Sequence, residues 1–377
     1  MFPNITVIGP EFIQGLLKGA LAFAAAALLA FALTPLVRVF AFKIGGVDVP
    51  KDDRRMHSKP IPTIGGLAVF LAFAVAVLLF AKPSASTVAA LGGGLLLIIV
   101  GILDDIFDVR AIFKFLVQIA AAILVMSQGV RMDYINFFGT YIEFKIFAYP
   151  ITLLWIVGLT NALNLIDGLD GLSCGIAAIS CVALFLTSLG AGDPAIIMLT
   201  AILGGACIGF LPFNKFPAKI FIGDTGATFL GFMLSVISIQ GLFKTHALLS
   251  FVAPFMILGV PIFDTLFAIF RRLLTGRHPF SPDRGHLHHR LIDLGFTQTQ
   301  TVRILYAVSA LLGIAAVILT LQMLWQALVI LVLSMAIAAF TWVVINNKET
   351  RCQSGLADEP ESPDEPGEVA EKSDKDE

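Results

Sequence analysis

The sequence predicts an all-α, polytopic integral membrane protein with about 11 transmembrane helices. Three observations lead to this fold class: 57% of the 377 residues are hydrophobic, only 14% are charged, and the mean hydropathy is +0.89. Such a composition excludes a soluble enzyme, a secreted disulfide scaffold and a nucleic-acid-binding protein with a basic surface.

Apolar runs long enough to cross a bilayer recur along the chain. A helix of about 20 residues spans about 30 Å of hydrocarbon while satisfying its own backbone. Residues 304–347 hold no charge and are about twice as long as one span requires, so this run is expected to reverse near Gln322 to Gln326. The other expected spans are 17–37, 63–82, 86–103, 112–130, 146–163, 172–190, 194–213, 225–243 and 247–270.

The distribution of Lys and Arg orients the chain, because cytoplasmic loops carry an excess of these residues. Twenty of the 25 lie in the C-terminal tail or in the loops that follow the odd-numbered spans up to the ninth. We therefore expect the N-terminus outside and the C-terminus in the cytoplasm.

Two regions of the chain differ in charge. Residues 1–345 form the expected membrane-embedded domain with cytoplasmic loops, whereas residues 346–377 carry 11 acidic and 4 basic side chains. The Pro, Glu, Asp, Ser and Lys content of this tail predicts disorder, and none of the motifs described below lies within it.

The first polar motif is LDDIFDVR, at the cytoplasmic end of the third expected span, with Asp104, Asp105 and Asp108. Three ionised carboxylates within five residues repel one another and favour a cation such as Mg²⁺, which prefers oxygen ligands and often bridges to phosphates. Lys114 follows closely. The alternative is a charge cluster that only marks the end of the helix.

A second motif, NALNLIDGLDGLS, places oxygen-bearing side chains at steps of three, at Asn161, Asn164, Asp167 and Asp170. On a helix this spacing keeps polar groups near one side, and Gly168 lets backbone approach a ligand closely. A structural polar seam between helices is the alternative.

The third motif, KIFIGDTGATF, runs from an apolar stretch into Asp224 just before the eighth expected span. Asp224 either caps that helix or contributes to a polar site. Phe221 is expected to pack at the membrane interface unless a planar ligand is present.

The longest hydrophilic loop, residues 271–296, holds His286, His288 and His289 between Arg284 and Arg290. This cationic group suits phosphates, and loop structure alone is the alternative. The His spacing differs from that of a helical zinc site, and no Cys is near.

A fifth segment, from Gly45 to Gly66, adds His57 and Lys59. We expect Lys59 to contribute a substrate-binding cation, with a positive-inside anchor as the alternative. Together the loops bring carboxylates and amides opposite several cations, a combination that suits a Mg²⁺-bound diphosphate.

In this order, from about Gly45 to Phe296, the motifs resemble those of the polyprenyl-phosphate N-acetylhexosamine-1-phosphate transferase family. The segment SPDRGHLHHRLIDLGFT is similar to the UDP-GlcNAc branch rather than to the phospho-MurNAc-pentapeptide translocase branch. The resemblance implies transfer of a sugar 1-phosphate, in the first place GlcNAc-1-phosphate, from a UDP-N-acetylhexosamine to undecaprenyl phosphate in the bacterial cytoplasmic membrane. UMP is released, and lipid-linked cell-envelope polysaccharides such as O-antigen or teichoic acid are started.

The resemblance also implies roles for individual residues. Asn164 and Asp224 would contact Mg²⁺, or Mn²⁺ as a substitute, and Asp104 and Asp105 would form the acidic pair at the reaction centre. Lys114 would hold the diphosphate. The remaining implied substrate contacts are Asp170 and Phe221 for uracil, His286, His288, His289 and Arg290 for phosphate and sugar, and Asp167 and Asp264 facing the site.

Two other classes of protein fit parts of the sequence. A divalent-cation or proton-coupled transporter would use intramembrane Asn, Asp and His, but would place them near the midplane. A prenyl-chain synthase would use the aspartate-rich DDIFD, but the second such motif is absent. The expected partners are the nucleotide sugar, the lipid phosphate and the bilayer, and no nucleic acid. The sequence does not decide between a monomer and a homodimer, nor which amino sugar is donated.

Overall fold

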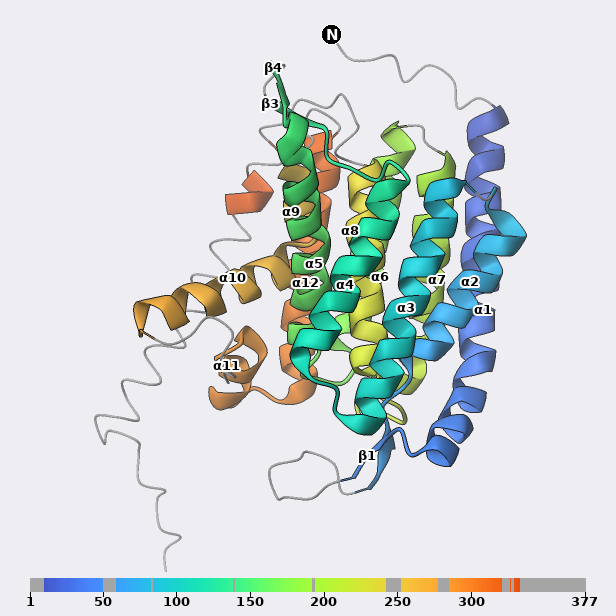
Figure 1. Ribbon diagram of the computed structural model, residues 1–377, viewed down its shortest axis with the longest axis vertical. Coiled ribbons are helices and arrows are strands. Elements are labelled where there is room, and N and C mark those ends of the chain that lie inside the picture. The colour runs from blue at the N-terminus through green and yellow to red at the C-terminus, as the bar shows by residue number, and fades with distance from the viewer. Residues whose placement is uncertain are drawn as a thin grey trace, which may run out of the picture.

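A computed structural model of the chain describes residues 10–49, 59–82, 84–137, 140–191, 194–241, 252–276, 285–320, 326 and 329–332. These residues are mostly helical, and they form a multi-pass membrane protein (Figure 1). The α-helices are α1 (Pro10–Ile44), α2 (Gly66–Phe80), α3 (Ala85–Phe107), α4 (Ala111–Ser127), α5 (Ala148–Ile166), α6 (Leu172–Ala191), α7 (Pro194–Asn214), α8 (Gly223–Gly241), α9 (Val252–Ile257), α10 (Gly259–Leu274), α11 (Leu287–Asp293) and α12 (Gln298–Thr320).

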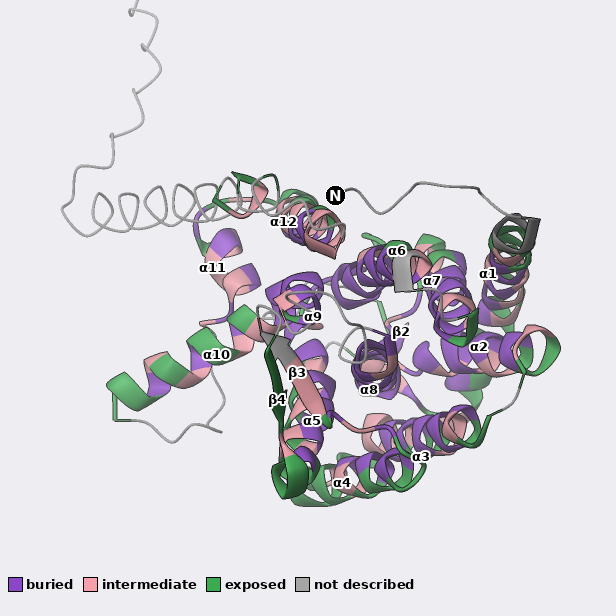
Figure 2. Cartoon of the chain, turned by 90° about the horizontal axis from the view of Figure 1, so that it is seen from above, coloured by how far each residue is buried: buried purple, intermediate pink, exposed green. Residues whose placement is uncertain are grey.

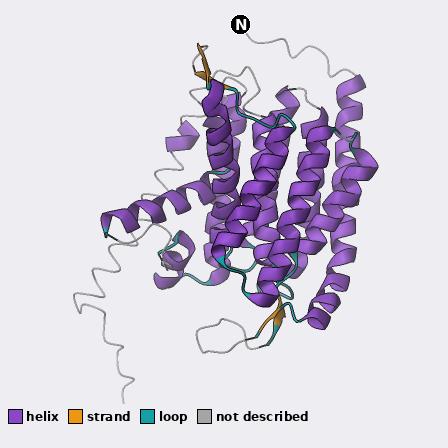
Figure 3. Ribbon diagram, viewed as in Figure 1, coloured by secondary structure: helices purple, strands orange, loops and turns teal. Residues whose placement is uncertain are grey.

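Two short antiparallel hairpins lie at opposite ends of the helix bundle (Figure 3). At one end, called the β1 end below, β1 (Val47–Asp48) pairs with β2 (Ile61–Pro62). At the other end β3 (Tyr134–Phe137) pairs with β4 (Thr140–Glu143), and a 3-10 turn, η1 (Lys145–Phe147), leads into α5.

The described residues contain six helices that are long and apolar enough to span a membrane: α1, α3, α5 with η1, α6, α7 and α12. The helices α2 and α4 are apolar but shorter. The number of 11 spans stays a prediction, because the reversal expected near Gln322 to Gln326 and the span after it lie largely outside the described residues. The acidic tail also lies outside them.

Helix α8 occupies the centre of the bundle when it is seen from above (Figure 2). Nearly all of its residues are buried, and it contacts α2, α3, α5, α6 and α7. Glycines allow this close packing: a Cβ on Gly66 of α2 would come within 2.1 Å of Gly226 Cα, and one on Gly101 of α3 within 2.4 Å of Thr225 Cα. The first turn of α8 is therefore fixed against two neighbouring helices at the β1 end.

The single span expected over residues 247–270 is wrong, because the helix breaks at Leu258. Pro261 has no amide hydrogen to donate to the Ile257 carbonyl, which instead accepts a hydrogen bond from Ser180 Oγ at 3.1 Å. Past the break, α10 leaves the bundle and projects to one side (Figures 1 and 2). The Phe263 and Phe270 side chains of α10 are exposed, while Asp264 is buried.

Candidate active site

Two carboxylates and one lysine meet at the β1 end of the bundle. The Lys114 ammonium lies 2.7 Å from Asp104 Oδ2 and 3.0 Å from Asp224 Oδ2. Asp104 comes from the last turn of α3, Lys114 from the start of α4 and Asp224 from the first turn of α8. The Asp104 side chain is 9% exposed, whereas those of Lys114 and Asp224 are 28% and 33% exposed. Solvent therefore reaches this cluster mainly from the side of Lys114 and Asp224.

The three acidic residues of the motif LDDIFDVR have different surroundings. Asp105 Oδ2 accepts a hydrogen bond from Thr225 Oγ1 at 2.7 Å, which ties α3 to the first turn of α8. Asp104 Oδ1 accepts one from the Val109 amide at 2.9 Å. Asp108 is exposed and ends α3 in the left-handed conformation, with φ at 53°. The motif LDDIFDVR thus divides into two functional candidates, Asp104 and Asp105, and a helix-ending Asp108.

The second motif does not form one helical face, because α5 ends at Ile166. Asn161 Nδ2 donates to Gln118 Oε1 at 2.6 Å, so this residue belongs to a polar seam between α4 and α5. Asn164, one turn further along α5, interacts electrostatically with the Asp224 carboxylate. Only the second amide of the motif therefore joins the cluster around Lys114.

Asp167 and Asp170 follow in a loop, residues 167–171, which we call the DG loop. Ser173 Oγ donates to Asp167 Oδ1. Burial raises the pKa of Asp167 to about 7, and the nearby charges of Asp224 and Asp170 raise it further. Asp170 Oδ2 accepts a hydrogen bond from the Ala218 amide at 2.9 Å, which joins the DG loop to the segment that leads into α8.

The predicted aromatic contact, Phe221, has a firmly held backbone. Its amide donates to the Pro62 carbonyl at 2.8 Å, and its carbonyl accepts from the Gly65 amide at 3.0 Å. The Phe221 side chain is half-buried. Lys59, two residues before β2, is exposed at the same end of the bundle. The structure thus places both residues at the β1 end, and their substrate contacts stay predictions.

The His-rich segment packs against the DG loop. His288 is 1% exposed, and a Cβ on Gly168 would come within 2.2 Å of its Nε2 atom. Burial lowers the pKa of His288 to about 4, and His289 and His286 lower it further, so the ring is neutral at pH 7. The group that packs closely against Gly168 is therefore the His288 imidazole. The phosphate contact predicted for His288 stays a prediction.

The neighbours of His288 are held from α10. His286 Nδ1 lies 2.8 Å from Asp264 Oδ2, and the Arg290 guanidinium lies over the Phe267 ring at 5.2 Å from its centroid. The rings of His288 and His289 are in contact, with centroids 4.2 Å apart. The other two cation candidates of these loops, His57 and Arg284, lie outside the described residues.

A metal ion would find a small set of oxygen ligands here. In the part of the chain that the structure describes, no group of three or more His, Cys, Asp or Glu side chains is arranged to hold a metal. What these residues offer is Asp104, Asp224 and Asn164 around one cationic group. Mg²⁺ is commonly held by one or two carboxylates, with phosphate and water oxygens as its other ligands, and the cluster fits that mode of binding.

Two contacts of the site were not predicted from the sequence. Thr225 and Ser173 each donate a hydrogen bond to a site carboxylate, Asp105 and Asp167 respectively. Both residues belong to the polar motifs, but their type gives no sign of the partner. Asp105 and Thr225 are 120 positions apart, so only the packing of α3 on α8 brings them together.

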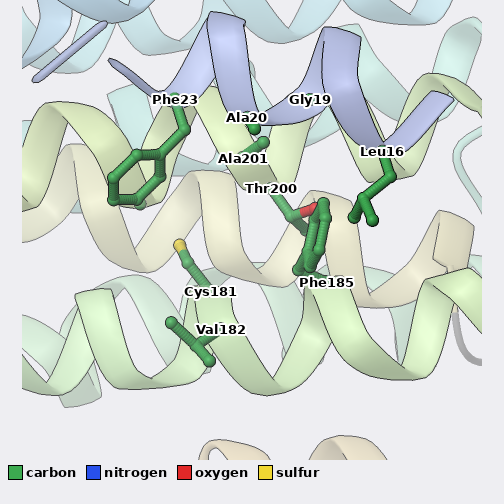
Figure 4. Close-up of a pocket in the computed structure, with 10 residues that line it drawn as sticks. Leu16, Gly19, Ala20, Phe23, Cys181, Val182, Phe185, Thr200 and Ala201 are labelled. Atoms are coloured by element: carbon green, nitrogen blue, oxygen red, sulfur yellow. The ribbon is translucent and has the colours of Figure 1, made fainter. Parts of the chain in front are cut away.

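A cavity of about 280 Å³ lies away from this polar cluster, between α1, α6 and α7 (Figure 4). Leu16, Phe23, Val182 and Phe185 are among its lining residues, which are almost all apolar. They lie in the half of the bundle opposite the β1 end, so we assign this cavity no part in the chemistry.

Comparison with known proteins identifies a family and several relatives of this chain. The profile of glycosyl transferase family 4 matches residues 87–242, a stretch that contains Asp104, Lys114 and Asp224. The chain is 40% identical over 341 residues to a probable undecaprenyl-phosphate N-acetylglucosaminyl 1-phosphate transferase of Bacillus subtilis, and the match covers 89% of this chain and 95% of that protein.

Two further relatives carry related names. A decaprenyl-phosphate N-acetylglucosaminephosphotransferase of Mycolicibacterium smegmatis is 36% identical over 316 residues, with 74% of this chain and 77% of that protein covered. An undecaprenyl-phosphate alpha-N-acetylglucosaminyl 1-phosphate transferase of Escherichia coli K12 is 32% identical over 290 residues, with 73% and 77% covered.

Proposed function

Since the chain belongs to glycosyl transferase family 4, the polyprenyl-phosphate N-acetylhexosamine-1-phosphate transferases, we propose that it transfers GlcNAc-1-phosphate from UDP-GlcNAc to undecaprenyl phosphate. The products are UMP and a lipid diphosphate sugar, which starts the synthesis of a lipid-linked cell-envelope polysaccharide. The named relatives from Bacillus subtilis and Escherichia coli support the acceptor and the transferred group.

The observation that carries this proposal is the Lys114 ammonium between the carboxylates of Asp104 and Asp224. A lysine ammonium has three N–H donors, and two of them point at these carboxylates. A diphosphate that enters from the exposed side of Lys114 meets the remaining donor. The partly exposed carboxylates beside it would repel that diphosphate unless a divalent cation were bound between them.

Mg²⁺ is the cofactor that we propose, with Mn²⁺ as a substitute. Asp224 and Asn164 would hold it, and Asp104 lies close enough to Lys114 to balance the charge of the group. When bound, the ion supplies positive charge for the oxygens of the transferring phosphoryl group.

The donor nucleotide would extend from this cluster across the DG loop. Asp170 is held by the Ala218 amide, three residues before Phe221, so the proposed uracil contacts are joined by one short segment. The sugar and its phosphate would then face the segment with His286, His288, His289 and Arg290, which packs on the same loop through His288.

The reaction proceeds best as one displacement. An oxygen of undecaprenyl phosphate attacks the β-phosphorus of UDP-GlcNAc, a new P–O bond forms to the lipid phosphate, and the bond from the β-phosphorus to the bridging oxygen breaks and leaves UMP. A phosphate monoester with a second pKa near 6 is mostly dianionic at pH 7, so the attack needs little help from a base. Asp104 and Asp105 would orient the acceptor phosphate or remove its last proton.

We propose that the β1 end faces the cytoplasm of a bacterial cell, where a nucleotide sugar is available. The positive-inside distribution of Lys and Arg supports this orientation. Arg110, Lys114, Lys215 and Arg290 belong to segments at or near this end.

The proposal is tested with purified protein, undecaprenyl phosphate, Mg²⁺ and a panel of UDP-sugars. UMP release from UDP-GlcNAc that depends on the lipid phosphate supports it, and weaker release from UDP-GalNAc or UDP-glucose would define the donor. If no UDP-sugar yields UMP under these conditions, the proposed function is wrong.

A further inference from the structure

Asp264 is a buried carboxylate on α10, outside the cluster around Lys114. Its side chain is 2% exposed, and both of its oxygens are used by the same short segment. Oδ2 lies 2.8 Å from His286 Nδ1, and Oδ1 accepts a hydrogen bond from the Leu287 amide at 2.7 Å. A buried carboxylate is costly unless it is hydrogen-bonded, so these two contacts together define where α11 begins.

The contact with Asp264 sets the tautomer and the orientation of the His286 imidazole as well as its position. Because a carboxylate accepts hydrogen bonds, this contact favours the His286 tautomer that carries its hydrogen on Nδ1. Pairing of this kind sets both the tautomer and the orientation of a histidine ring. The Nε2 atom of His286 is thereby directed away from Asp264.

His288, two residues further along, packs against both the His286 ring and the DG loop. The His286 and His288 rings are nearly parallel, at 10°, with centroids 6.0 Å apart. His288 in turn contacts Gly168, where a Cβ would come within 2.2 Å of Nε2. A continuous row of contacts therefore runs from Asp264 through two imidazoles to the loop that carries Asp167 and Asp170.

A second attachment from α10 supports this row. Arg271 Nη1 donates to the Gly285 carbonyl at 2.6 Å, and the guanidinium groups of Arg271 and Arg290 both lie over the Phe267 ring, at 5.7 and 5.2 Å from its centroid. The segment Gly285–Arg290 is thus bound to α10 at its start, its middle and its end.

We propose that Asp264 is a positioning residue of the sugar-phosphate transfer. It acts through His286 and the Leu287 amide to hold the His-rich segment against the DG loop, so that the groups predicted to bind the sugar phosphate and the uracil keep a fixed separation. This inference rests on the proposed function, and it assigns Asp264 no contact with the reacting atoms.

The test compares Asp264→Asn, His286→Ala and the double variant with Asp293→Asn, an exposed Asp at the end of α11 that serves as the matched control. The asparagine can still accept from Leu287, but its NH₂ group cannot accept from Nδ1. We expect Asp264→Asn to lower kcat on the order of 100-fold, because small displacements of binding groups have effects of that size. Asp264→Glu should recover part of the loss, and Asp293→Asn should match the wild type.

The double variant separates positioning from an independent role. If Asp264 acts through His286, adding Asp264→Asn to His286→Ala costs little more than His286→Ala alone. The proposal would be overturned if the decrease in kcat of the double variant equalled the product of the two single-variant decreases. It would also be overturned if Asp264→Asn were as active as Asp293→Asn.

A second pair of variants tests the other end of the row. Gly168→Ala should separate α11 from the DG loop and lower kcat, whereas Gly158→Ala on α5 should have no effect, because no atom lies within 4 Å of a Cβ built there. Equal activity of the two variants would count against the proposal.

Hydrogen exchange of residues 286–293 provides a readout that needs no activity. Faster exchange in Asp264→Asn than in Asp293→Asn is expected, and equal exchange would contradict the positioning contact even if the wild type released no UMP. A wild type that releases no UMP, together with faster exchange, would leave the contact standing and reject the proposed function.

Discussion

Lys114 Nζ lies 3.0 Å from Asp224 Oδ2, although the two residues are 110 positions apart in the sequence. The contact exists because the start of α4 and the first turn of the central helix α8 meet at the β1 end. It joins the predicted diphosphate-binding cation to a predicted metal ligand. The proposed binding of a metal-bound diphosphate would replace these ion pairs within the same cluster.

Replacing Lys114 tests the cationic half of this cluster. Lys114→Met keeps much of the apolar stem but removes the charge, so the transition-state oxygens lose a fixed cation. We expect kcat to fall on the order of 10²- to 10³-fold. Lys114→Arg should recover little, since a planar guanidinium does not fit a place shaped for an ammonium between two carboxylates. Lys145→Met, at the exposed turn η1, is the matched control and should retain full activity; a fully active Lys114→Met would reject this role.

Replacing Asp224 tests the metal half. Asp224→Asn keeps the size of the side chain but weakens a ligand of a hard cation, so the Mg²⁺ concentration needed for half-maximal activity should rise roughly tenfold or more. Chelation by EDTA should abolish UMP release in the wild type, and Mg²⁺ should restore it. Asp108→Asn is the control, because Asp108 is exposed and asparagine tolerates its left-handed backbone. An unchanged Mg²⁺ requirement in Asp224→Asn would contradict the assignment.

Because Asp167 is buried, the stability of the folded protein should depend on pH. Its pKa is raised by burial to about 7 in the folded protein, from an ordinary value of 3.8. The folded state therefore binds this proton more tightly than the unfolded state, so the contribution of Asp167 is most favourable below pH 4 and is lost as the pH rises to 7. Asp167→Asn should raise the melting temperature at pH 8 relative to the wild type and should have a smaller effect at pH 4. A melting temperature lowered equally at both values would show that this ionisation is not the cause.

The order of bond changes can be tested without variants. A single displacement requires the lipid acceptor, so UDP-GlcNAc labelled with ¹⁸O at the bridging position should show no positional isotope exchange when undecaprenyl phosphate is absent. Exchange under these conditions would indicate reversible cleavage through an aspartyl phosphate on Asp104 or Asp105. The matched sample with both substrates confirms that the preparation is active.

Sequence reasoning predicted residue types at the site better than their partners. Asp104, Lys114, Asn164 and Asp224 stand in polar motifs beside apolar runs, and in the structure they lie together. The same reasoning grouped Asn161 with them, but Asn161 pairs with Gln118. Spacing within a motif could not reveal this, because the helix ends at Ile166 and the partner belongs to another helix.

For the fold as well, the helices along long apolar runs were predicted, but a helix break that involves a distant residue was not. Long apolar runs predicted α3, α6 and α7 to within a few residues, because one helix satisfies its own backbone in lipid. Helix α1 (Pro10–Ile44) is longer than its expected span (17–37) at both ends, and α12 begins at 298 rather than at 304. The break at Leu258 was missed, since it depends on the Ser180 hydroxyl of another helix, which binds the carbonyl left unpaired by Pro261. Contacts between residues that are far apart in the sequence depend on packing, so a local sequence pattern does not predict them.

The most direct test of the account follows the β-phosphorus of the donor. Purified protein is incubated with undecaprenyl phosphate, Mg²⁺ and UDP-GlcNAc that carries ³²P at the β-position. Transfer of sugar 1-phosphate predicts that the label enters the lipid fraction while unlabelled UMP appears in equal amount. Label that remains in water-soluble UDP while the sugar reaches the lipid, or the absence of any transfer, would contradict it.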